Sequence, residues 1–356
     1  MSKSAKYTIV GLMSGTSQDG LDIALCEFEG SGAELSYKIL KAETIPYSSS
    51  QKNKLRSLPY LNVENYFKLH HQFGKFMGRE VLNFLKGVSQ KPNAVASHGH
   101  TVFHQPKLGF STQLGCGATL AAYSEITTVC DFRSMDVALH GQGAPLVPIG
   151  DELLFGNYAS CLNLGGIANI SFKKNNSRVA FDICIANMAL NHFALLSGSD
   201  YDKNGNWAKS GKLNETLFNE LNALDFFKMK GARSIGREWF ESEFLYTIEK
   251  HKLQVNDILN TLVHHISFQV SRVLNDNDLK NVFVTGGGTH NSFLIETLKN
   301  YYRGEVIIPD PVTINYKEAL IFALLGYLRL NEFINTLSSV TGAKKNSVGG
   351  AVYFSK

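Results

Sequence analysis

The sequence predicts an α/β protein made of two similar domains, each a βββαβα unit, with a ligand-binding cleft between them. Its 356 residues are 44% hydrophobic and 19% charged, which is enough chain for two buried cores. Two series of three short β-like runs occur, one near the N-terminus and one after residue 155, and helical stretches follow each. Similar domains in one chain commonly bind ligands in the cleft between them.

The first unit opens with β-like runs over residues 7–13, 21–28 and 37–45, which Gly, Ser or Asp residues separate. Residues 63–85 carry a loose apolar face at helical spacing, so they predict a helix. A short buried strand is expected over residues 93–97. These elements together predict a three-stranded meander followed by a helix and a fourth strand.

The second unit repeats this order of elements without repeating the sequence. Its β-like runs cover residues 158–164, 167–172 and 178–183, and a strong helix pattern follows over residues 255–274. A strand over 282–284, a helix from about 291, a strand over 306–308 and a helix from about 316 complete it. The repeat predicts two copies of one architecture.

Composition excludes several classes of protein. The formal charge of +4 is small and the Lys and Arg residues are scattered, so the sequence predicts no nucleic-acid surface. The apolar run after Lys6 breaks at Ser14, too early for a signal-peptide core, and no other apolar stretch predicts a membrane span. The five cysteines are odd in number and lack metal-type spacing, so we expect reduced thiols in a cytoplasm.

The first candidate site is the glycine-rich turn over residues 11–20, between the first two strands. Gly15 and Gly20 allow a positive φ and a close approach of the backbone to a ligand. Ser14, Thr16 and Ser17 add hydroxyl and amide donors for phosphate oxygens. The turn lacks the Lys-Ser or Lys-Thr pair of a P-loop, and a plain hairpin is the alternative interpretation.

Two further glycine turns lie in the second unit. One joins its first two strands, the place equivalent to the first turn, so the pair predicts a grip on phosphates from two sides. The other follows the strand 282–284 and precedes a helix, which is where open α/β sheets bind ligands. The residues expected to hold a nucleotide are Asn163, Gly165, Gly166, Gly286, Gly287, Gly288 and Asn291.

Asp182 ends the third strand of the second unit and precedes Asn187 and a helix-like run. A carboxylate beside a phosphate-binding turn serves as a general base or helps to hold Mg2+. An Asp that only caps the following helix is the alternative.

Alternate histidines, His98 and His100, stand at the end of the strand 93–97. Metal-dependent hydrolases use such pairs as ligands, but nothing in the sequence completes a metal site. We therefore expect a polar loop that contacts a ligand, or structural histidines. The passages 131–136 and 140–148, which contain Asp131 and Gln142, predict a crossover that lines the cleft, although a simple linker has a similar composition.

Taken together, these segments resemble the anhydro-N-acetylmuramic acid kinase family of the sugar kinase, actin and heat-shock ATPase superfamily. The resemblance covers nearly the whole chain. Two motifs are highly specific: Gly-Leu-Met-Ser-Gly-Thr-Ser-x-Asp-Gly from residue 11, and Gly-Gln-Gly-Ala-Pro-Leu-Val-Pro from residue 141. The other segments that carry it are residues 97–106, 131–136, 163–169, 181–182, 201–205, 236–238, 285–291 and 318–323.

The resemblance implies two ribonuclease-H-like domains with ATP in the cleft between them, in a cytoplasmic enzyme of peptidoglycan recycling. The implied reaction takes ATP, water and 1,6-anhydro-N-acetylmuramic acid to N-acetylmuramic acid 6-phosphate and ADP, with Mg2+. The catalytic residue carries over to Asp182, which activates the water and is also the candidate for holding Mg2+. The ATP-binding turn carries over to Gly15, Thr16, Ser17, Gln18, Asp19, Gly20 and Asp22. The residues expected to contact the sugar are His98, His100, Asp131, Gln142, Asn187 and Glu318.

The resemblance also implies the domain boundaries. The first domain is expected to contain residues 1–130 and about 341–356, because the strand-like stretch 350–354 returns to it. The second is expected to contain residues 131–340. A homodimer is implied as well, with no nucleic-acid or membrane partner.

One departure from the family pattern bears on activity. The family commonly follows its aspartate with Thr-Gly-Pro, a small residue and Asn, whereas residues 183–186 here read Ile-Cys-Ile-Ala. A lesser departure is His100, where the family usually has Gln. Three alternatives therefore stay open: another sugar kinase of the same fold, a nucleotide-binding homologue without kinase activity, and a metal-dependent hydrolase that uses His98 and His100.

Overall fold

The computed structural model describes residues 6–15, 18–229, 231 and 233–355 and divides the chain into two compact units. The first contains Met1–Leu154 and Tyr316–Lys356, and the second contains Phe155–Asn315. These boundaries differ from the expected ones, because residues 131–154 and 316–340 belong to the first unit. No helix in the described parts of the chain is long and apolar enough to cross a membrane.

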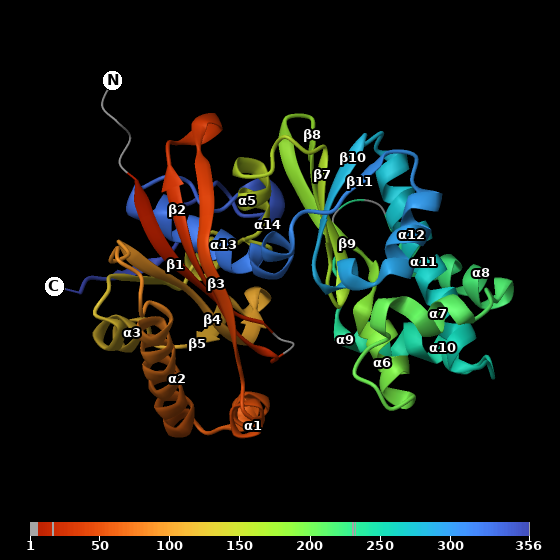
Figure 1. Ribbon diagram of the computed structural model, residues 1–356, viewed down its shortest axis with the longest axis horizontal. Helices are drawn as coiled ribbons and strands as arrows, with labels where there is room; N and C mark the ends of the chain where they lie inside the picture. The colour runs from red at the N-terminus through yellow and green to blue at the C-terminus, as the bar shows by residue number, and fades with distance from the viewer. Residues whose placement is uncertain (1–5, 16–17, 230, 232, 356) are drawn as a thin grey trace. The chain divides into compact units, whose positions relative to one another are not determined.

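The first unit is built on a seven-stranded sheet in the order β12-β6-β4-β1-β2-β3, with β5 paired to β4 (Figure 1). Its strands are β1 (Tyr7–Ser14), β2 (Gly20–Glu29), β3 (Ser36–Pro46), β4 (Ala94–Gln105), β5 (Phe110–Leu114), β6 (Thr128–Cys130) and β12 (Ala351–Tyr353). Its helices are α1 (Ser49–Ser57), α2 (Val63–Phe84), α3 (Gly117–Ser124), α4 (Ser134–Ala138), α5 (Pro148–Leu153), α14 (Ser338–Thr341) and, from Tyr316 onward, α13 (Pro311–Leu330).

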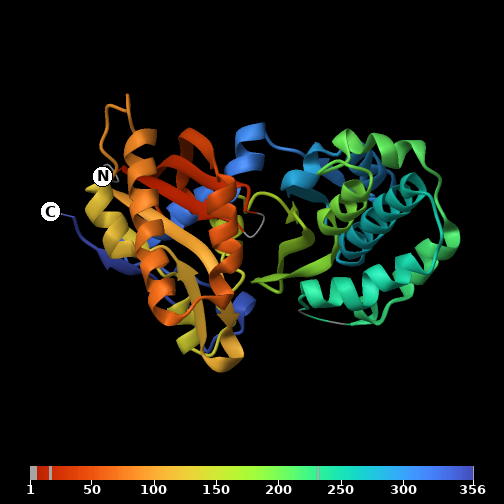
Figure 2. The same ribbon diagram turned by 90° about the horizontal axis from the view of Figure 1, so that it is seen from below.

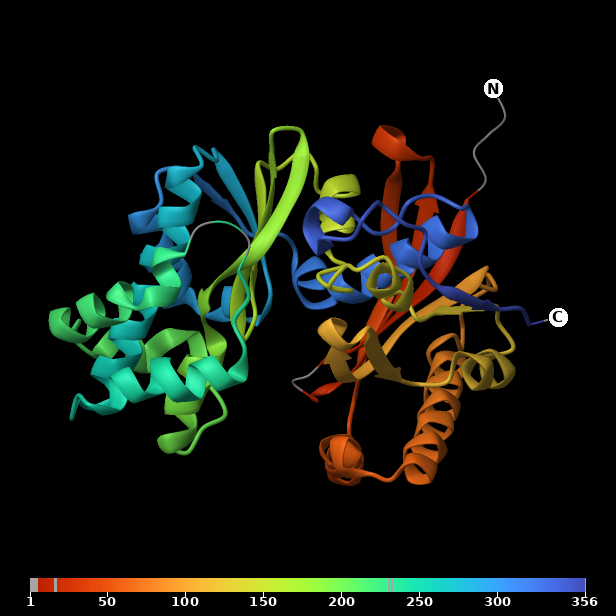
Figure 3. The ribbon, with the colours of Figure 1, turned by 180° about the vertical axis from the view of Figure 1, so that it is seen from behind.

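Successive residues of β1 point to opposite faces of this sheet, and a helix packs on each face. Val10 and Leu12 join a buried cluster with residues of α2, including Met77. Gly11 faces the other way, where a Cβ would stand 1.9 Å from the carbonyl oxygen of Ala319 in α13. That contact explains why α13 belongs to the first unit, and Figure 3 shows α13 and the C-terminal segment in blue on this unit. The pairing of β12 with β6 places the stretch 350–354 as expected.

The second unit is built on a five-stranded sheet in the order β11-β10-β7-β8-β9. Its strands are β7 (Ser160–Leu164), β8 (Ile167–Lys174), β9 (Ser177–Ile185), β10 (Asn281–Thr285) and β11 (Glu305–Ile307). Its helices are α6 (Asn187–Leu196), α7 (Asn206–Ser210), α8 (Glu215–Ala223), α9 (Arg237–Trp239), α10 (Tyr246–Glu249), α11 (Val255–Asp276) and α12 (Ser292–Tyr301). The long helix α11 is the centre of its helical layer, with α6, α7, α8 and α12 packed around it (Figure 2).

The two sheets have the same topology. In each, three antiparallel strands of a meander are followed by two strands parallel to the first, as β6-β4-β1-β2-β3 and as β11-β10-β7-β8-β9. The prediction of an α/β protein with a duplicated unit is therefore confirmed. Each unit also carries elements that the sequence did not predict: β5, β6 and α3 in the first, and the helices between residues 206 and 249 in the second.

Candidate active site

The first candidate turn joins β1 to β2, as a hairpin from which no helix begins. Thr16 and Ser17 lie outside the described residues. The residue in the left-handed region is Gln18, at φ 59°, and its N–H donates to the carbonyl of Gly15 at 3.2 Å. Gly20 does not have a positive φ; glycine is required there because a Cβ would stand 2.5 Å from the carbonyl oxygen of Ile45. The positive φ that glycine allows is not used at Gly20, and close packing explains the glycine instead.

Strand pairing brings His100 to this turn. Parallel pairing of β1 with β4 sets Ser14 opposite His100, and the Ser14 hydroxyl lies 3.0 Å from Nδ1 of the ring. The Tyr47 hydroxyl donates to the Ser14 oxygen at 2.7 Å, so a chain of three side chains fixes the imidazole. Burial lowers the pKa of His100, which favours the neutral ring.

His98 is paired with an arginine from the crossover. Its Nδ1 lies 2.9 Å from the carbonyl of Gly99, which only accepts, so Nδ1 carries the proton. Nε2 then accepts from Arg133, whose Nη2 is 2.8 Å away, and Nη1 of the same guanidinium donates to the carbonyl of Gly143 at 2.6 Å. Burial and then the Arg133 charge hold the pKa of His98 well below its usual range. Both ring nitrogens are used, so His98 has none left for a metal ion.

Two carboxyl groups of the first unit have raised pKa values. Burial and the neighbouring Asp19 raise the pKa of Asp22, although a 2.6 Å hydrogen bond from Thr44 opposes this. Burial by the surrounding protein, and then the negative charge of Asp22, raise the pKa of Glu318. The positive charges of Lys317 and Arg133 oppose this rise. The Glu318 side chain reaches solvent, so the desolvation of its carboxyl group is incomplete. The expected nucleotide residue Asp22 and the expected sugar residue Glu318 thus share one electrostatic environment.

Asp136, which was not among the candidate site residues, holds the crossover segment 131–148 in place. The Asp136 carboxylate, 1% exposed, accepts from the Gly143 N–H and the Thr341 hydroxyl, each at 2.7 Å. Asp131 is exposed, and its carboxylate accepts from the hydroxyl of Ser134 at 2.6 Å. The Gln142 side chain is exposed as well, on a segment that Asp136 fixes to the C-terminal part of the unit.

In the second unit the two glycine turns meet at the ends of neighbouring parallel strands. Asn163 of β7 stands opposite Thr285 of β10, immediately before the two turns. Gly286 has φ 89°, and a Cβ there would stand 2.4 Å from the side-chain oxygen of Asn163. Gly166 and Gly287 differ, because a Cβ at either would have no protein atom nearer than 3.8 Å. Packing in this unit does not require those two glycines, so their missing side chains leave room for a ligand.

Asn187 lies beside both turns. Its side-chain amide donates to the carbonyl of Leu164 at 2.9 Å, and its backbone N–H donates to the carbonyl of Gly165 at 3.1 Å. A Cβ at Gly288 would stand 3.3 Å from the same amide nitrogen. Asn291, by contrast, uses its side chain to cap α12 through the N–H of Leu294. The fold therefore unites the two turns and Asn187, which lie far apart in the sequence.

Asp182 is held by the loop that precedes α9. Its Oδ2 accepts from the N–H of Ile235 at 2.9 Å and from the Ser234 hydroxyl at 3.1 Å. Within the described residues no hydrogen bond ends at Oδ1, so one carboxylate oxygen is fixed and the other is available. Burial raises the pKa of Asp182, while those two hydrogen bonds and Arg233 oppose the rise. The carboxylate does not cap α6, so the alternative of a helix cap is wrong.

Residues 183–186, which depart from the family pattern, lie in the hydrophobic core of the second unit. Residues 183–186 have no exposed surface, and β9 pairs with β8 through an irregularity that leaves Ile183 out of the register. Asp182 stays paired with Asn169 on one side of this bulge, and Cys184 is paired with Ala168 on the other. Among the described residues, no three His, Cys, Asp or Glu side chains gather as metal ligands would.

Comparison with known proteins identifies the family. The family model described as anhydro-N-acetylmuramic acid kinase matches residues 7–355. The chain is 35% identical to the anhydro-N-acetylmuramic acid kinase of Francisella tularensis subsp. novicida, over 97% of this chain and 98% of that one. It is 35% identical to the protein of that name from Aliivibrio fischeri, also over 97% and 98%.

Among solved structures, the activator of the 2-hydroxyisocaproyl-CoA dehydratase from Clostridium difficile, with bound ADPNP, is matched at a TM-score of 0.47 and 14% identity. That match covers 91% of this chain and 96% of the other. The family model spans nearly the full length, and the sequence relatives do so as well at more than 30% identity. The chain belongs to the anhydro-N-acetylmuramic acid kinase family.

Proposed function

We propose that this protein phosphorylates 1,6-anhydro-N-acetylmuramic acid with ATP and water, giving N-acetylmuramic acid 6-phosphate and ADP. Family membership and the names of its relatives support this reaction. The observation that carries it is the carboxylate of Asp182, with one oxygen held by two hydrogen bonds and the other available.

Asp182 acts as the general base in this proposal. It takes a proton from the water that attacks the anomeric carbon, and the bond from that carbon to O6 breaks. The freed O6 attacks the γ-phosphoryl group, whose bond to ADP breaks as ADP leaves. A raised pKa makes a carboxylate a stronger base near neutral pH, and burial supplies that rise here. The hydrogen bonds from Ser234 and Ile235 fix the direction of the other oxygen.

The glycine turns are the proposed nucleotide site. The space above Gly166 and Gly287 admits backbone contact with phosphates or ribose, and the side-chain amide of Asn187 lies beside both turns. The carboxylate of Asp182 is also the proposed ligand of Mg2+, which prefers carboxylate oxygens and would neutralise charge on the transferring phosphoryl group. In the first unit His98, His100, Asp131, Gln142 and Glu318 are the proposed sugar contacts.

A cytoplasmic location is part of the proposal, because ATP is consumed and the five cysteines are free thiols. A role in peptidoglycan recycling and a homodimeric state are proposed on the family likeness, and sedimentation equilibrium tests the dimer.

The test is production of ADP and sugar phosphate from ATP, Mg2+ and the anhydro sugar by the native protein and by Asp182→Asn. We expect product from the native protein and at least a roughly hundredfold lower kcat in the variant. Asp225→Asn, which removes an exposed carboxylate of the same unit, should behave like the native protein. Nucleotide binding without product from the native protein would instead favour another sugar or a binding-only homologue.

A further inference from the structure

The carboxylate of Asp182 is held by a loop as well as by its own strand. β9 is an edge strand, and β8 pairs with one side of it. On the other side the N–H of Asp182 donates to the carbonyl of Arg233 at 3.0 Å. The next two residues of that loop, Ser234 and Ile235, supply both hydrogen bonds to Oδ2 of Asp182. The direction of the carboxylate therefore depends on where the loop lies.

The side chain of Arg233 fastens this loop to the strand. Its Nε donates to the carbonyl of Asp182 at 3.1 Å, so the two residues exchange two hydrogen bonds. Its Nη1 donates to the carbonyl of Met229 at 3.2 Å. The central carbon of the guanidinium lies 5.7 Å from the ring centre of Phe181 and 4.9 Å from that of Phe226. Aromatic faces attract cations at such distances, so the rings help to fix the guanidinium.

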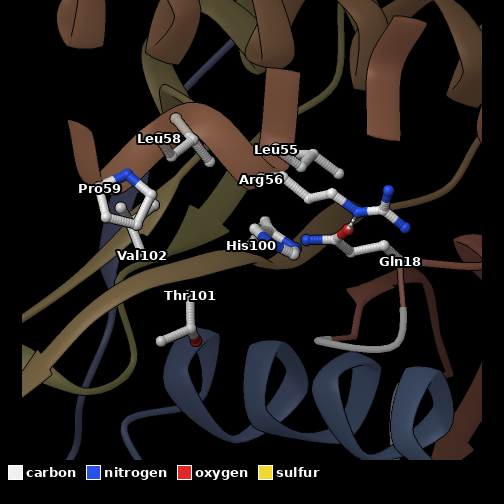
Figure 4. A pocket seen from close by; sticks show the side chains of 8 residues that line it. All are labelled: Gln18, Leu55, Arg56, Leu58, Pro59, His100, Thr101 and Val102. Atoms are coloured by element: carbon white, nitrogen blue, oxygen red, sulfur yellow. Dashed lines mark hydrogen bonds between the residues drawn. The ribbon is translucent and has the colours of Figure 1, made fainter. Parts of the chain in front are cut away.

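An arginine beside the first glycine turn uses the same side chain differently. Nε of Arg56 donates to the side-chain oxygen of Gln18 at 3.2 Å, at a pocket of about 270 Å³. Figure 4 shows the terminal nitrogens of Arg56 pointing away from His100, with Gln18 between them. Arg56 is exposed, whereas Arg233 is half-buried and contacts two rings. The contacts of Arg233 are therefore those of a side chain that supports its own unit.

The charge of Arg233 also affects the protonation of Asp182. Burial raises the pKa of Asp182, and the positive charge of Arg233 is among the causes that oppose the rise. A nearby opposite charge favours the ionised carboxylate, which is the form that a general base requires. Removal of this charge should therefore raise the pKa of Asp182, so that the carboxylate becomes protonated at a higher pH.

We propose that Arg233 is a positioning residue, which holds the loop 233–235 against β9 and thereby fixes the carboxylate of Asp182 for the attack of water. The inference rests on the proposed function, because it names the residue that orients the proposed general base. Arg233 touches no reacting atom in this arrangement and acts through Asp182. Lysine is a poor substitute, since its ammonium group lacks the planar fork that serves two carbonyls and lies against rings.

The first test is the kinetics of variants at residue 233 with ATP, Mg2+ and the anhydro sugar. Arg233→Met keeps a long side chain and removes the charge and the donors. It should lower kcat about ten- to hundredfold, leave both KM values within about twofold, and move the acidic limb of the kcat profile to higher pH. Arg233→Lys should restore the acidic limb but only part of kcat. Arg303→Met, at an exposed arginine of the same unit, should match the native protein.

The second test needs no turnover. Carbon-13 NMR of labelled aspartate, with Asp182→Asn to assign the signal, should show Asp182 titrating at higher pH in Arg233→Met than in the native protein. Circular dichroism shows which variants are folded, and Arg233→Lys serves both tests if Arg233→Met does not fold, with its loss of kcat as the expected result.

The outcomes separate this inference from the proposed function. A native kcat in a folded Arg233→Met protein would overturn the positioning role. Higher KM values with an unchanged kcat would overturn it too, and would make Arg233 a direct contact of a substrate. Absence of turnover by the native protein would overturn the proposed function, while the shifted titration of Asp182 would still support the hold of Arg233 on it. Equal titration in both proteins would overturn that hold.

Discussion

Gly286 has the most restrictive backbone geometry of the candidate nucleotide site. Its φ of 89° lies in the left-handed region, and a Cβ would meet Asn163 at 2.4 Å and the backbone of Leu164 at 2.8 Å. Gly286→Ala should therefore lower the unfolding free energy by roughly 3 kcal/mol, from backbone strain and from overpacking. It should also weaken ATP binding, because the two turns must separate. Urea unfolding and nucleotide titration measure these effects.

Gly198 provides the matched control for that change. Its φ is 84°, in the same unit, and a Cβ there would meet nothing within 4 Å. Gly198→Ala should cost only the left-handed penalty of about 1–2 kcal/mol and leave nucleotide affinity unchanged. Equal costs for the two substitutions would contradict the packing argument for Gly286.

The buried His98 ring predicts a pH dependence of stability. Its folded pKa lies well below the value of about 6.5 in the unfolded chain, so the unfolded state binds the proton first as pH falls. Stability from this group is therefore complete above pH 6.5 and is lost progressively below it, by about 1.4 kcal/mol per pH unit.

Variants separate this contribution from those of other groups. His98→Gln keeps an oxygen acceptor for Arg133 but does not titrate, so its unfolding free energy should fall less steeply between pH 6.5 and 5 than that of the native protein. His140→Gln, at an exposed histidine of the same unit, should retain the native slope. A native slope in His98→Gln would mean that His98 takes up its proton while folded.

At the scale of elements, substitutions in the crossover segment 131–148 should distinguish effects on activity from effects on stability. Gln142 is exposed and is a proposed sugar contact, so Gln142→Ala should lower kcat/KM about tenfold or more while the unfolding free energy changes by less than about 0.5 kcal/mol. Asp136→Asn should lower both, because the buried carboxylate accepts two hydrogen bonds and an amide presents a donor to one of them. Equal loss of activity and stability in Gln142→Ala would contradict the assignment of Gln142.

The elements also show what the sequence allowed us to predict. The strands of both meanders were found within about two residues of their observed ends, because regular apolar runs stop at Gly, Ser or Asp. The short helices between residues 206 and 249 were missed, since their apolar residues pack on α11 and on one another instead of forming one stripe. The three glycine turns were visible for the same reason as the strands, through composition at strand ends.

The pairing of His98 with Arg133 was beyond prediction, although both residues lie in segments that the sequence singled out. The two are 35 positions apart, and they meet because β6, the strand before Arg133, pairs in parallel with β4, which carries His98. Parallel pairing of a three-residue strand leaves almost no pattern in the sequence.

At the scale of the whole molecule, the two units share one sheet topology, but the chain builds them differently. The second unit is one continuous segment, whereas the first needs residues 316–356 to complete its sheet and to cover the face of β1 that carries Gly11. The buried residues of α13, a run from Ala319 to Leu325 with almost no exposed surface, supply that cover.

This inequality predicts different behaviour of two fragments. Residues 155–315 contain every member of their own core cluster, so this fragment should unfold cooperatively in urea, with native-like helix content by circular dichroism. Residues 1–154 lack both α13 and β12 and should bind a hydrophobic dye and show no cooperative transition. Adding residues 316–356 as a separate chain should restore a cooperative unfolding transition to the 1–154 fragment. A cooperative 1–154 fragment would mean that α13 is dispensable to the first unit, and that the contact at Gly11 does not hold the sheet together.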